Sequence, residues 1–200
     1  MVRVGIFGGT FDPPHIAHLI LAAEACDQLG LDRLLWVLTA DPPHKQGQFI
    51  TPLPRRLEML QAALADNPTF ELSRVDIDRL PPHYALETVQ LLKEQHPQAY
   101  MVYLMGGDSL KELPTWYRPQ EFLAACDAIG VMQRPGFETG LAELEAQLPG
   151  ISSKVRFVAA PLLEISSSQI RKRVSQGDPY RYFLPPAVCQ LIQEYHLYRF

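Results

Sequence analysis

The first eighteen residues combine an apolar run, a glycine pair and two histidines in an order that suits a phosphate-binding site. Residues 2–7 predict a buried strand, and Gly8 and Gly9 directly after it let the backbone pass close to a ligand. Pro14 suits the first position of a helix, which we expect to begin near His15. A helix start attracts an anion because it carries unpaired N–H groups and the positive end of the helix dipole.

The two histidines, His15 and His18, stand three residues apart and therefore share one face of the first helical turn. Both imidazoles could donate hydrogen bonds to phosphate oxygens there. A zinc site that includes Asp12 and a pair of solvated surface histidines are the alternatives. The sequence has no further Cys or His cluster at the spacing that would complete four zinc ligands. A position just after a strand and a turn, where open α/β sheets bind ligands, favours phosphate.

The composition is that of an ordinary globular protein. The chain has 200 residues, of which 47% are hydrophobic, so it can bury a sizeable core as one domain over residues 1–200. Its formal net charge of −4 argues against broad binding to nucleic acid or membranes. No apolar run reaches membrane-spanning length and no charged leader precedes the first strand. We therefore expect a cytoplasmic protein with a small-molecule partner.

The three cysteines, Cys26, Cys126 and Cys189, are far apart and lie among apolar helical positions. This placement predicts reduced core thiols and no disulfide framework. It also gives none of the three a catalytic role. The sequence leaves open whether the chain forms a homo-oligomer.

Strand-like and helix-like patterns alternate along the chain. The alternation predicts an α/β fold with a doubly wound, mostly parallel sheet, in which ligands lie beyond the carboxyl ends of the strands. The proline-rich stretch at 41–54 is expected to form a loop over that site. We expect strands at 2–7, 34–38, 70–75, 100–105, 128–132 and 155–159, and helices from about 15 to 29, 52–65, 86–95, 119–125, about 168–175 and 186–195.

A second phosphate signal lies at residues 164–173, where three serines open a helix whose first turns are basic. Ser167 or Ser168 can cap this helix, and Arg171 lies about one turn further on. Its guanidinium could bind a polyphosphate presented to the helix end. The alternative, an ordinary capped surface helix with solvated charges, is the commoner explanation of such a segment in isolation. The pairing with the first segment favours phosphate.

Single residues in three further loops could complete a nucleotide site. Lys45 follows the second strand and could bring a cation to the same ligand, although a lone loop lysine is usually only solvated. Asp108 follows the strand at 100–105 and could hold ribose hydroxyls or metal-bound water, or equally could cap a helix from Ser109. Trp116 could stack on an aromatic base or pack in the core.

Taken together, these segments resemble a known family. Residues 8–18 read Gly-Gly-Thr-Phe-Asp-Pro-Pro-His-Ile-Ala-His, and residues 165–171 read Ile-Ser-Ser-Ser-Gln-Ile-Arg. They resemble the two signatures of the nucleotidyltransferase superfamily, His-x-Gly-His and Ile-Ser-Ser-Thr/Ser-x-Ile-Arg. Residues 42–45, 107–110 and 114–117 are similar to the lysine, ribose and base-stacking segments of the bacterial nicotinate mononucleotide adenylyltransferase family. The resemblance implies a Rossmann-like nucleotidyltransferase fold in which residues from about 164 to 200 complete the ATP site.

Two places depart from the family pattern. Ala17 stands where the family has glycine, which adds a methyl group beside the two histidines. Residues 83–88 resemble the family's Ser-Tyr-Thr-x-x-Thr, but His83 and Ala85 lack the serine and threonine hydroxyls near the pyridine ring. A helix tolerates alanine, so activity is expected to survive the first change. The second leaves the choice between nicotinate and nicotinamide open.

The reaction that the resemblance implies is attack by a mononucleotide phosphate on the α-phosphorus of ATP, with release of pyrophosphate. No protein nucleophile is needed, because a phosphate is already ionised at pH 7 and the protein has only to align two polyanions and neutralise charge. The implied partners are ATP and nicotinate mononucleotide. Mg²⁺ is the implied cofactor, bound mainly through the ATP phosphates and with no predicted set of protein ligands.

The resemblance also assigns expected roles to the phosphate-binding residues. His18 would bind the oxygens of the transferring phosphoryl group, and His15 the phosphates beside it. Lys45 would bind the phosphate of either substrate, and Ser167 with Arg171 the outgoing pyrophosphate. The expected catalytic residues are His15, His18, Lys45 and Arg171.

The remaining expected contacts lie around the two nucleotides. Asp108 would hold a ribose and Trp116 would stack on the pyridine ring. The expected ATP contacts are Gly8, Gly9, Thr10, Phe11, His15, His18, Gly106, Asp108, Ile165, Ser166, Ser167, Ser168 and Arg171. The expected mononucleotide contacts are Thr10, Asp12, Lys45, Tyr84, Ala85, Trp116 and Tyr117.

Three other functions stay open at this point. The same transfer could use nicotinamide mononucleotide or phosphopantetheine as the acceptor, which an acceptor panel would separate. A cytidylyltransferase is a second alternative. A nucleotide-sensing module without turnover, suggested by Ala17 and Ala85, would bind ATP without releasing pyrophosphate.

Overall fold

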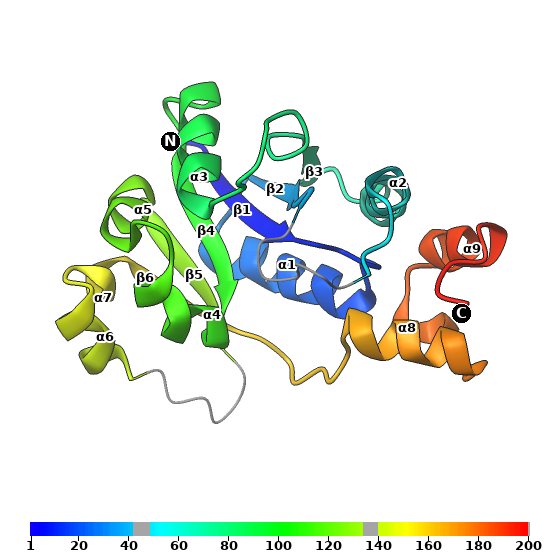
Figure 1. Ribbon diagram of the computed structural model, residues 1–200. Coiled ribbons are helices and arrows are strands. Elements are labelled where there is room, and N and C mark those ends of the chain that lie inside the picture. Colours follow the sequence, from blue (N-terminus) through cyan, green and yellow to red (C-terminus); the bar gives the residue numbers. More distant parts are fainter. Residues whose placement is uncertain (42–48, 134–139, 200) are drawn as a thin grey trace.

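A six-stranded parallel sheet forms the centre of the molecule (Figure 1). The structure is a computed structural model that describes residues 1–41, 49–133 and 140–199. The strands pair in the order β3-β2-β1-β4-β5-β6, and every neighbouring pair is parallel, which confirms the doubly wound α/β fold expected from the sequence. The strands are β1 (Arg3–Gly9), β2 (Arg33–Leu38), β3 (Phe70–Ser73), β4 (Tyr100–Gly106), β5 (Ala128–Gln133) and β6 (Val155–Ala159).

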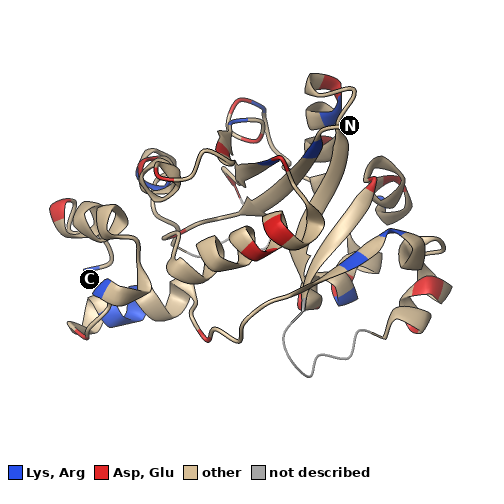
Figure 2. Ribbon diagram, turned by 180° about the vertical axis from the view of Figure 1, so that it is seen from behind, with Lys and Arg blue, Asp and Glu red and all other residues tan. Residues whose placement is uncertain are grey.

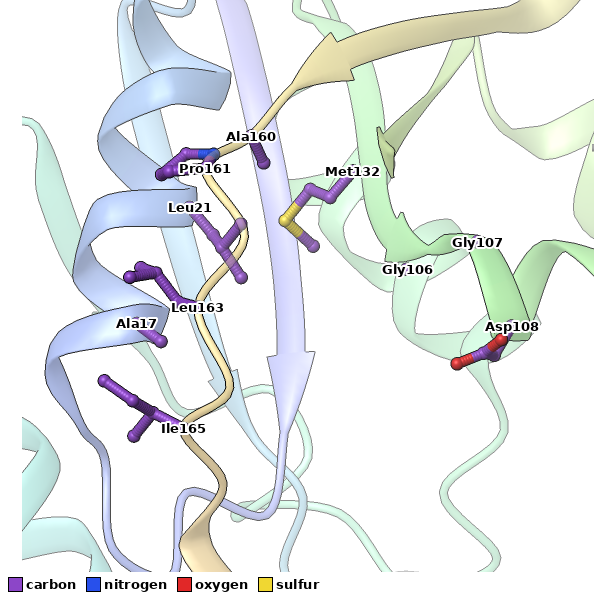
Figure 3. A pocket seen from close by; sticks show the side chains of 10 residues that line it. All are labelled: Ala17, Leu21, Gly106, Gly107, Asp108, Met132, Ala160, Pro161, Leu163 and Ile165. Carbon is purple, nitrogen blue, oxygen red and sulfur yellow. The ribbon is translucent and has the colours of Figure 1, made fainter. Parts of the chain in front are cut away.

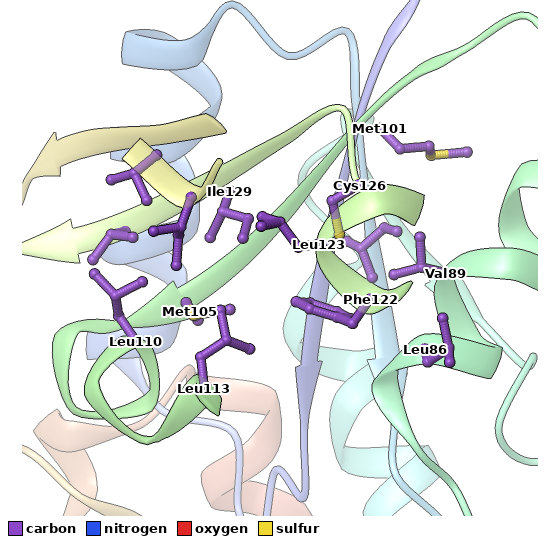
Figure 4. Close-up of a cluster of buried hydrophobic side chains, with 14 of the residues drawn as sticks. Leu86, Val89, Met101, Met105, Leu110, Leu113, Phe122, Leu123, Cys126 and Ile129 are labelled. Carbon is purple, nitrogen blue, oxygen red and sulfur yellow. The ribbon is translucent and has the colours of Figure 1, made fainter. Parts of the chain in front are cut away.

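Helices cover both faces of the sheet, because its central strands carry apolar side chains on both sides. On one face, a buried cluster joins Leu86 and Phe122 of the covering helices to Ile129 of the sheet (Figure 4). On the other face, the small side chains of Ala22 and Ala25 pack against the strands. The first face carries α3 (Ala85–Gln95), α4 (Gly107–Glu112), α5 (Pro119–Ala125), α6 (Leu141–Gln147) and α7 (Ile151–Lys154), and the second carries α1 (Ile16–Leu29) and α2 (Leu53–Leu64).

The C-terminal part of the chain packs against α2. Helices α8 (Ser167–Gln176) and α9 (Pro186–Glu194) lie beside α2 at one end of the molecule (Figure 1). Their shared apolar cluster contains no strand residue among those that the structure describes. It consists of Met59, Ile170, Val174, Leu184, Val188, Cys189, Ile192 and Tyr198. The serine-rich segment is therefore positioned by α2 and α9.

The predicted strands and helices agree with the observed ones to within two residues at each end. Helices α6 and α7 have no counterpart in the prediction, and α4 corresponds only to the alternative of a helix from Ser109. These helices are short, and a helical period hardly stands out in so few residues. The prediction for Pro14 is wrong, since α1 begins at Ile16 and His15 is its extended N-cap, with φ −141° and ψ 170°. Pro14 thus lies before the helix, and a histidine occupies the capping position.

The strand order places the site. The chain builds β1, β2 and β3 outward and then returns to add β4 on the other side of β1, so the order reverses between β1 and β4. In open α/β sheets the crevice at such a reversal receives the ligand. The carboxyl ends of these two strands are Gly8–Gly9 and Gly106, as the sequence predicts.

All three cysteines are unpaired, and Cys126 and Cys189 are buried. Burial raises the pKa of the Cys26 thiol to about 11 and that of Cys126 to about 12, so both stay protonated at neutral pH. Among the described residues, no helix has the length and apolar character needed to cross a membrane.

Candidate functional site

Two stacked imidazoles stand where β1 leads into α1. The ring centroids of His15 and His18 lie 3.6 Å apart with 17° between the ring planes, so the structure brings this pair together as predicted. The backbone N–H of His15 donates to Nδ1 of His18 over 3.2 Å. A neutral His18 therefore carries its proton on Nε2, which is the atom with which it can donate to a phosphate oxygen.

His15 is buried, with 4% of its surface exposed. Burial lowers the pKa of its imidazole to about 4, so His15 is neutral at pH 7. A neutral imidazole offers one N–H donor and no charge. His15 therefore adds no positive charge to the site at neutral pH.

The ring of Phe11 packs against His18. Their centroids lie 5.2 Å apart in an edge-on arrangement, and Phe7 meets Phe11 in the same way at 5.6 Å. A Cβ on Gly9 would come within 2.8 Å of the Phe11 ring, so only glycine leaves room for it. Phe11 itself has φ 45°, which is uncommon for a residue with a side chain. The Phe11 ring therefore packs against His18, so only the backbone of Phe11 can contact a nucleotide.

The two segments that suggested phosphate binding are joined by hydrogen bonds, although more than 150 residues separate them. The Ser167 hydroxyl donates to the carbonyl of Pro13 over 2.9 Å. Nη1 of Arg171 donates to the carbonyl of Asp12 over 2.8 Å. The two segments therefore lie side by side, as expected if they contribute to one site.

Helix α8 is capped by Ser166, whose Oγ accepts the backbone N–H of Gln169 over 3.2 Å. The prediction that Ser167 or Ser168 caps this helix is wrong, because the Ser167 hydroxyl is bonded to the first segment instead. The Ser168 hydroxyl lies 3.4 Å from Nη2 of Arg171. Basic residues gather on α8 in Figure 2, and one of them, Arg171, is bonded to the first segment.

A buried arginine that the sequence analysis does not single out ties the surrounding loops together. Arg56 of α2 is only 2% exposed. Its pKa is lowered by burial, an effect that the charge of Asp12 opposes. Arginine nevertheless stays charged in proteins. Its guanidinium donates over 2.7–3.2 Å to the carbonyls of Thr10, Thr39, Ala40 and Thr51.

Asp12 is also buried, and both of its carboxylate oxygens accept hydrogen bonds from the protein. Oδ1 accepts the Tyr198 hydroxyl over 2.7 Å, and Oδ2 accepts the backbone N–H of Thr51 over 3.1 Å. Burial and the Asp12 charge raise the pKa of Tyr198, which keeps the phenol protonated as a donor. The Asp12 carboxylate thus links the phosphate loop to the C-terminal segment.

A first pocket of about 180 Å³ opens between the start of α1 and the end of β4 (Figure 3). Asp108 points into it from α4, opposite Ala17 of α1. Asp108 lies in the first turn of α4, whose N-cap is Gly106, so the alternative that Asp108 is the cap is wrong. The largely apolar wall suits a planar base. The lining residues are Ala17, Leu21, Gly106, Gly107, Asp108, Met132, Ala160, Pro161, Leu163 and Ile165.

A second pocket of about 490 Å³ lies on the other face of the sheet. Its walls include five of the residues expected to contact a mononucleotide, namely Thr10, Tyr84, Ala85, Trp116 and Tyr117, together with Gly8, Gly9 and Thr39. The rings of Tyr84 and Tyr117 stack with centroids 4.2 Å apart. Trp116 is half-buried and also packs against Phe122 at 5.3 Å. Trp116 therefore packs on the core, as one of its two alternatives predicts, and it also lines the pocket.

The start of α3 forms one end of this pocket and is held by a buried ion pair. Nη2 of Arg79 lies 2.9 Å from Oδ1 of Asp76, which also accepts the Thr88 hydroxyl over 2.8 Å. The same guanidinium donates to the carbonyl of Tyr84 over 3.3 Å. No side chain of the described residues caps the N-terminus of α3, so its first N–H groups are available to a ligand beside Ala85.

The two pockets flank the histidine turn. Ala17, between the two histidines, lines the first pocket, and Gly8 to Thr10 line the second. Lys45 lies outside the residues that the structure describes. Within the described parts of the chain, no group of three His, Cys, Asp or Glu side chains could hold a metal ion, so the zinc alternative gains no support.

Known proteins resemble this chain over its whole length. The Cytidylyltransferase-like family model matches residues 6–173. A Thermomicrobium roseum protein named "Probable nicotinate-nucleotide adenylyltransferase" is 44% identical over 199 residues, which cover 100% of this chain and 92% of the relative. The nicotinate-nucleotide adenylyltransferase of Bacillus subtilis is 39% identical over 99% of both chains.

A solved structure supports the fold. Plasmodium falciparum nicotinic acid mononucleotide adenylyltransferase complexed with NaAD has a TM-score of 0.81 to this structure at 18% identity, over 99% of this chain and 98% of that one. This likeness concerns the fold alone, a Rossmann-like nucleotidyltransferase fold. Because full-length relatives share about two fifths of their residues with it, the chain belongs to the nicotinate-nucleotide adenylyltransferase family.

Proposed function

We propose that this protein joins ATP and nicotinate mononucleotide to form nicotinate adenine dinucleotide and pyrophosphate, a step of NAD biosynthesis. The observation that carries the proposal is the position of two pockets on either side of the histidine turn. Nucleotides bound in them would bring their phosphates to the same helix start, which attracts anions. The relatives of this chain carry names for the same activity.

The chemistry asks the protein for alignment and charge stabilisation. An oxygen of the mononucleotide phosphate attacks the α-phosphorus of ATP, and the bond from that phosphorus to the pyrophosphate oxygen breaks. Nε2 of His18 would donate to the α-phosphoryl oxygens as their charge changes. His15 would donate as a neutral imidazole, since burial lowers its pKa to about 4. The positive charge that neutralises the phosphates would come from Arg171 and Lys45.

On the ATP side, the base would occupy the first pocket and Asp108 would hold the ribose. Backbone groups of Gly8 to Phe11 and the start of α8 would bind the phosphates. Hydrogen bonds from Ser167 and Arg171 to the first segment support the proposal that residues from about 164 to 200 complete this site. The Asp12 carboxylate, held by Tyr198 and Thr51, would then fix the position of the phosphate loop.

Mg²⁺ would be bound mainly by the phosphate oxygens of ATP. Such an ion keeps several waters and needs only one or two protein carboxylates in addition to phosphate oxygens. Asp108 is the carboxylate among the described residues of the ATP pocket. When bound, the ion neutralises phosphate charge. Three unpaired cysteines support a place in the reducing cytoplasm.

At the pyridine end, Trp116 would stack on the ring while Tyr84 and Tyr117 close the side of the pocket. Ala85 offers no hydroxyl, but its backbone lies at the uncapped start of α3. Free N–H groups and the helix dipole there favour a carboxylate over a neutral amide. Recognition of nicotinate would thus depend on the backbone, which explains how the family's threonine can be replaced by alanine.

Replacing Trp116 with alanine is expected to raise KM for the mononucleotide by roughly 10-fold or more and to leave KM for ATP nearly unchanged, because the stacking partner of one base is lost. Steady-state kinetics with each substrate varied in turn measures both constants. Tyr182→Ala removes an aromatic ring that is 87% exposed and serves as the control. Equal changes in the two KM values would contradict stacking on the pyridine ring.

The proposed function is tested by following ATP labelled in its α-phosphate, with Mg²⁺ and nicotinate mononucleotide. We expect the label in a dinucleotide and one pyrophosphate released per dinucleotide formed. Transfer to phosphopantetheine in place of the mononucleotide, or ATP binding without pyrophosphate release, would contradict the proposal. The second result would identify a nucleotide-sensing module.

A further inference from the structure

We infer that the Tyr103 hydroxyl is a further substrate contact, which donates a hydrogen bond to the ribose of the bound mononucleotide. The inference rests on the proposed function, because it concerns the pocket assigned to that substrate. None of the sequence signatures includes this residue.

Tyr103 reaches the pocket from the sheet itself. It lies on β4 opposite Ile6 of β1, and residues two apart on a strand point to the same face. Gly8 therefore lies on the same face as Ile6, one step closer to the carboxyl end of β1. The Tyr103 hydroxyl is 3.5 Å from the point that a Cβ on Gly8 would occupy. Both residues line the second pocket, so the hydroxyl lies beside the first glycine of the phosphate loop.

The ring of Tyr103 is held in place by aromatic neighbours. Its centroid lies 5.0 Å from that of Phe122 and 6.2 Å from that of Trp116, both in edge-on arrangements. A ring packed in this way loses little further freedom when a ligand binds. The hydroxyl is thus preorganised.

The hydroxyl also has no hydrogen-bond partner in the described part of the chain. Among residues 1–41, 49–133 and 140–199, none exchanges a hydrogen bond with it. Burial, reinforced by the charge of Asp76, raises the pKa of the phenol, so it stays protonated and can donate. A half-buried hydroxyl at a pocket wall gains a partner when a polar ligand atom arrives.

The ribose is the part of the mononucleotide that fits this position. Trp116 marks the proposed pyridine site, and Gly8 to Thr10 mark the proposed phosphate site. Tyr103 contacts Trp116 through its ring and approaches Gly8 through its hydroxyl, so it spans the distance between them. In a mononucleotide, the sugar connects the base to the phosphate.

Tyr103→Phe removes only the hydroxyl, and Tyr100→Phe is the matched control. Tyr100 lies on the same strand, and its hydroxyl donates to the carbonyl of Asp127 over 3.3 Å, away from both pockets. We expect Tyr103→Phe to raise the Kd and the KM for nicotinate mononucleotide by roughly 3- to 10-fold, the effect of one neutral hydrogen bond. KM for ATP should stay unchanged. Calorimetric titration measures Kd without turnover.

Mononucleotides that lack the 2′- or the 3′-hydroxyl identify the acceptor. With the analogue that lacks the accepting hydroxyl, the wild-type protein and Tyr103→Phe should have the same Kd. A difference that persists with both analogues, or an unchanged Kd in Tyr103→Phe, would overturn the inference even if the enzyme is fully active. Weaker binding to Tyr103→Phe in a protein that never transfers the adenylyl group would uphold the inference and overturn the proposed function.

Discussion

His18→Ala is expected to lower kcat by about 10² to 10³-fold, the loss that follows removal of one donor to the transition state. Nε2 of His18 carries the proton because Nδ1 accepts the backbone N–H of His15. The stacked ring of His15, 3.6 Å away, cannot take over this role while it keeps its own position. The drop is measured as the rate of pyrophosphate release at saturating ATP and mononucleotide.

A second substitution separates catalysis from folding. Alanine at position 18 also removes the acceptor of the His15 N–H, which could loosen the start of α1. Asparagine keeps an acceptor close to the position of Nδ1 but has no group at Nε2. We expect His18→Asn to retain the melting temperature of the wild type and to lose as much kcat as His18→Ala. A folded His18→Asn variant with wild-type kcat would contradict the role of Nε2.

Arg56→Met is expected to destabilise the protein by about 3–5 kcal/mol, the cost of removing one member of a buried charged network. Four backbone carbonyls would lose the hydrogen bonds that the guanidinium gives them. The charge of Asp12, which now lies near Arg56, would lose its opposite charge. For a protein of this size the melting temperature should fall by about 6–20 °C, and urea unfolding gives the free energy directly.

The neighbouring residue supplies the control. Arg55 has a side chain that is 42% exposed, pairs with Glu58 at 3.0 Å and lies over the Tyr195 ring at 3.5 Å. Arg55→Met should cost less than about 1 kcal/mol, as expected for an exposed pair. Equal losses for the two variants would show that the buried hydrogen bonds of Arg56 contribute little.

The positions of the strands and helices are well predicted from the sequence because the central strands are buried on both faces. Apolar runs such as residues 34–38 and 128–132 stand out in the sequence as strands. Gly30 and residues 67–68, which interrupt regular secondary structure, lie between a helix and the next strand. The glycines at the ends of β1 and β4 then place the site at the strand reversal. Because ligands bind at such a reversal, the two segments with a phosphate-binding pattern, residues 8–18 and 164–173, could be predicted to contribute to one site.

The supporting network could not be predicted, because it depends on which backbone groups meet in three dimensions. Arg56 lies on the buried face of α2 with Met59 and Leu60. A charged residue on the apolar face of a helix is the sequence feature that could have indicated its buried role. Asp12 reads as a ligand in the sequence, whereas its oxygens bind Tyr198 and Thr51. No spacing rule connects these positions, since the partners are up to 186 positions apart in the sequence.

The second pocket shows the same limit in another form. Asp76 and Arg79 follow a short edge strand, where a charged pair normally suggests a solvated turn. The pair is instead buried and fixes the start of α3, which forms one end of the pocket. Likewise, Tyr103 reads as an ordinary strand residue in the sequence, and only the strand register brings it beside Gly8.

The most direct test of this account compares kcat/KM for nicotinate mononucleotide and nicotinamide mononucleotide, with ATP and Mg²⁺ held saturating. The uncapped start of α3 should favour the carboxylate, and we expect the acid to be preferred by at least about 100-fold, or roughly 2.7 kcal/mol in transition-state binding. Comparable values for the two substrates would contradict backbone recognition of the carboxylate. Absence of pyrophosphate release with either would contradict the proposed activity itself.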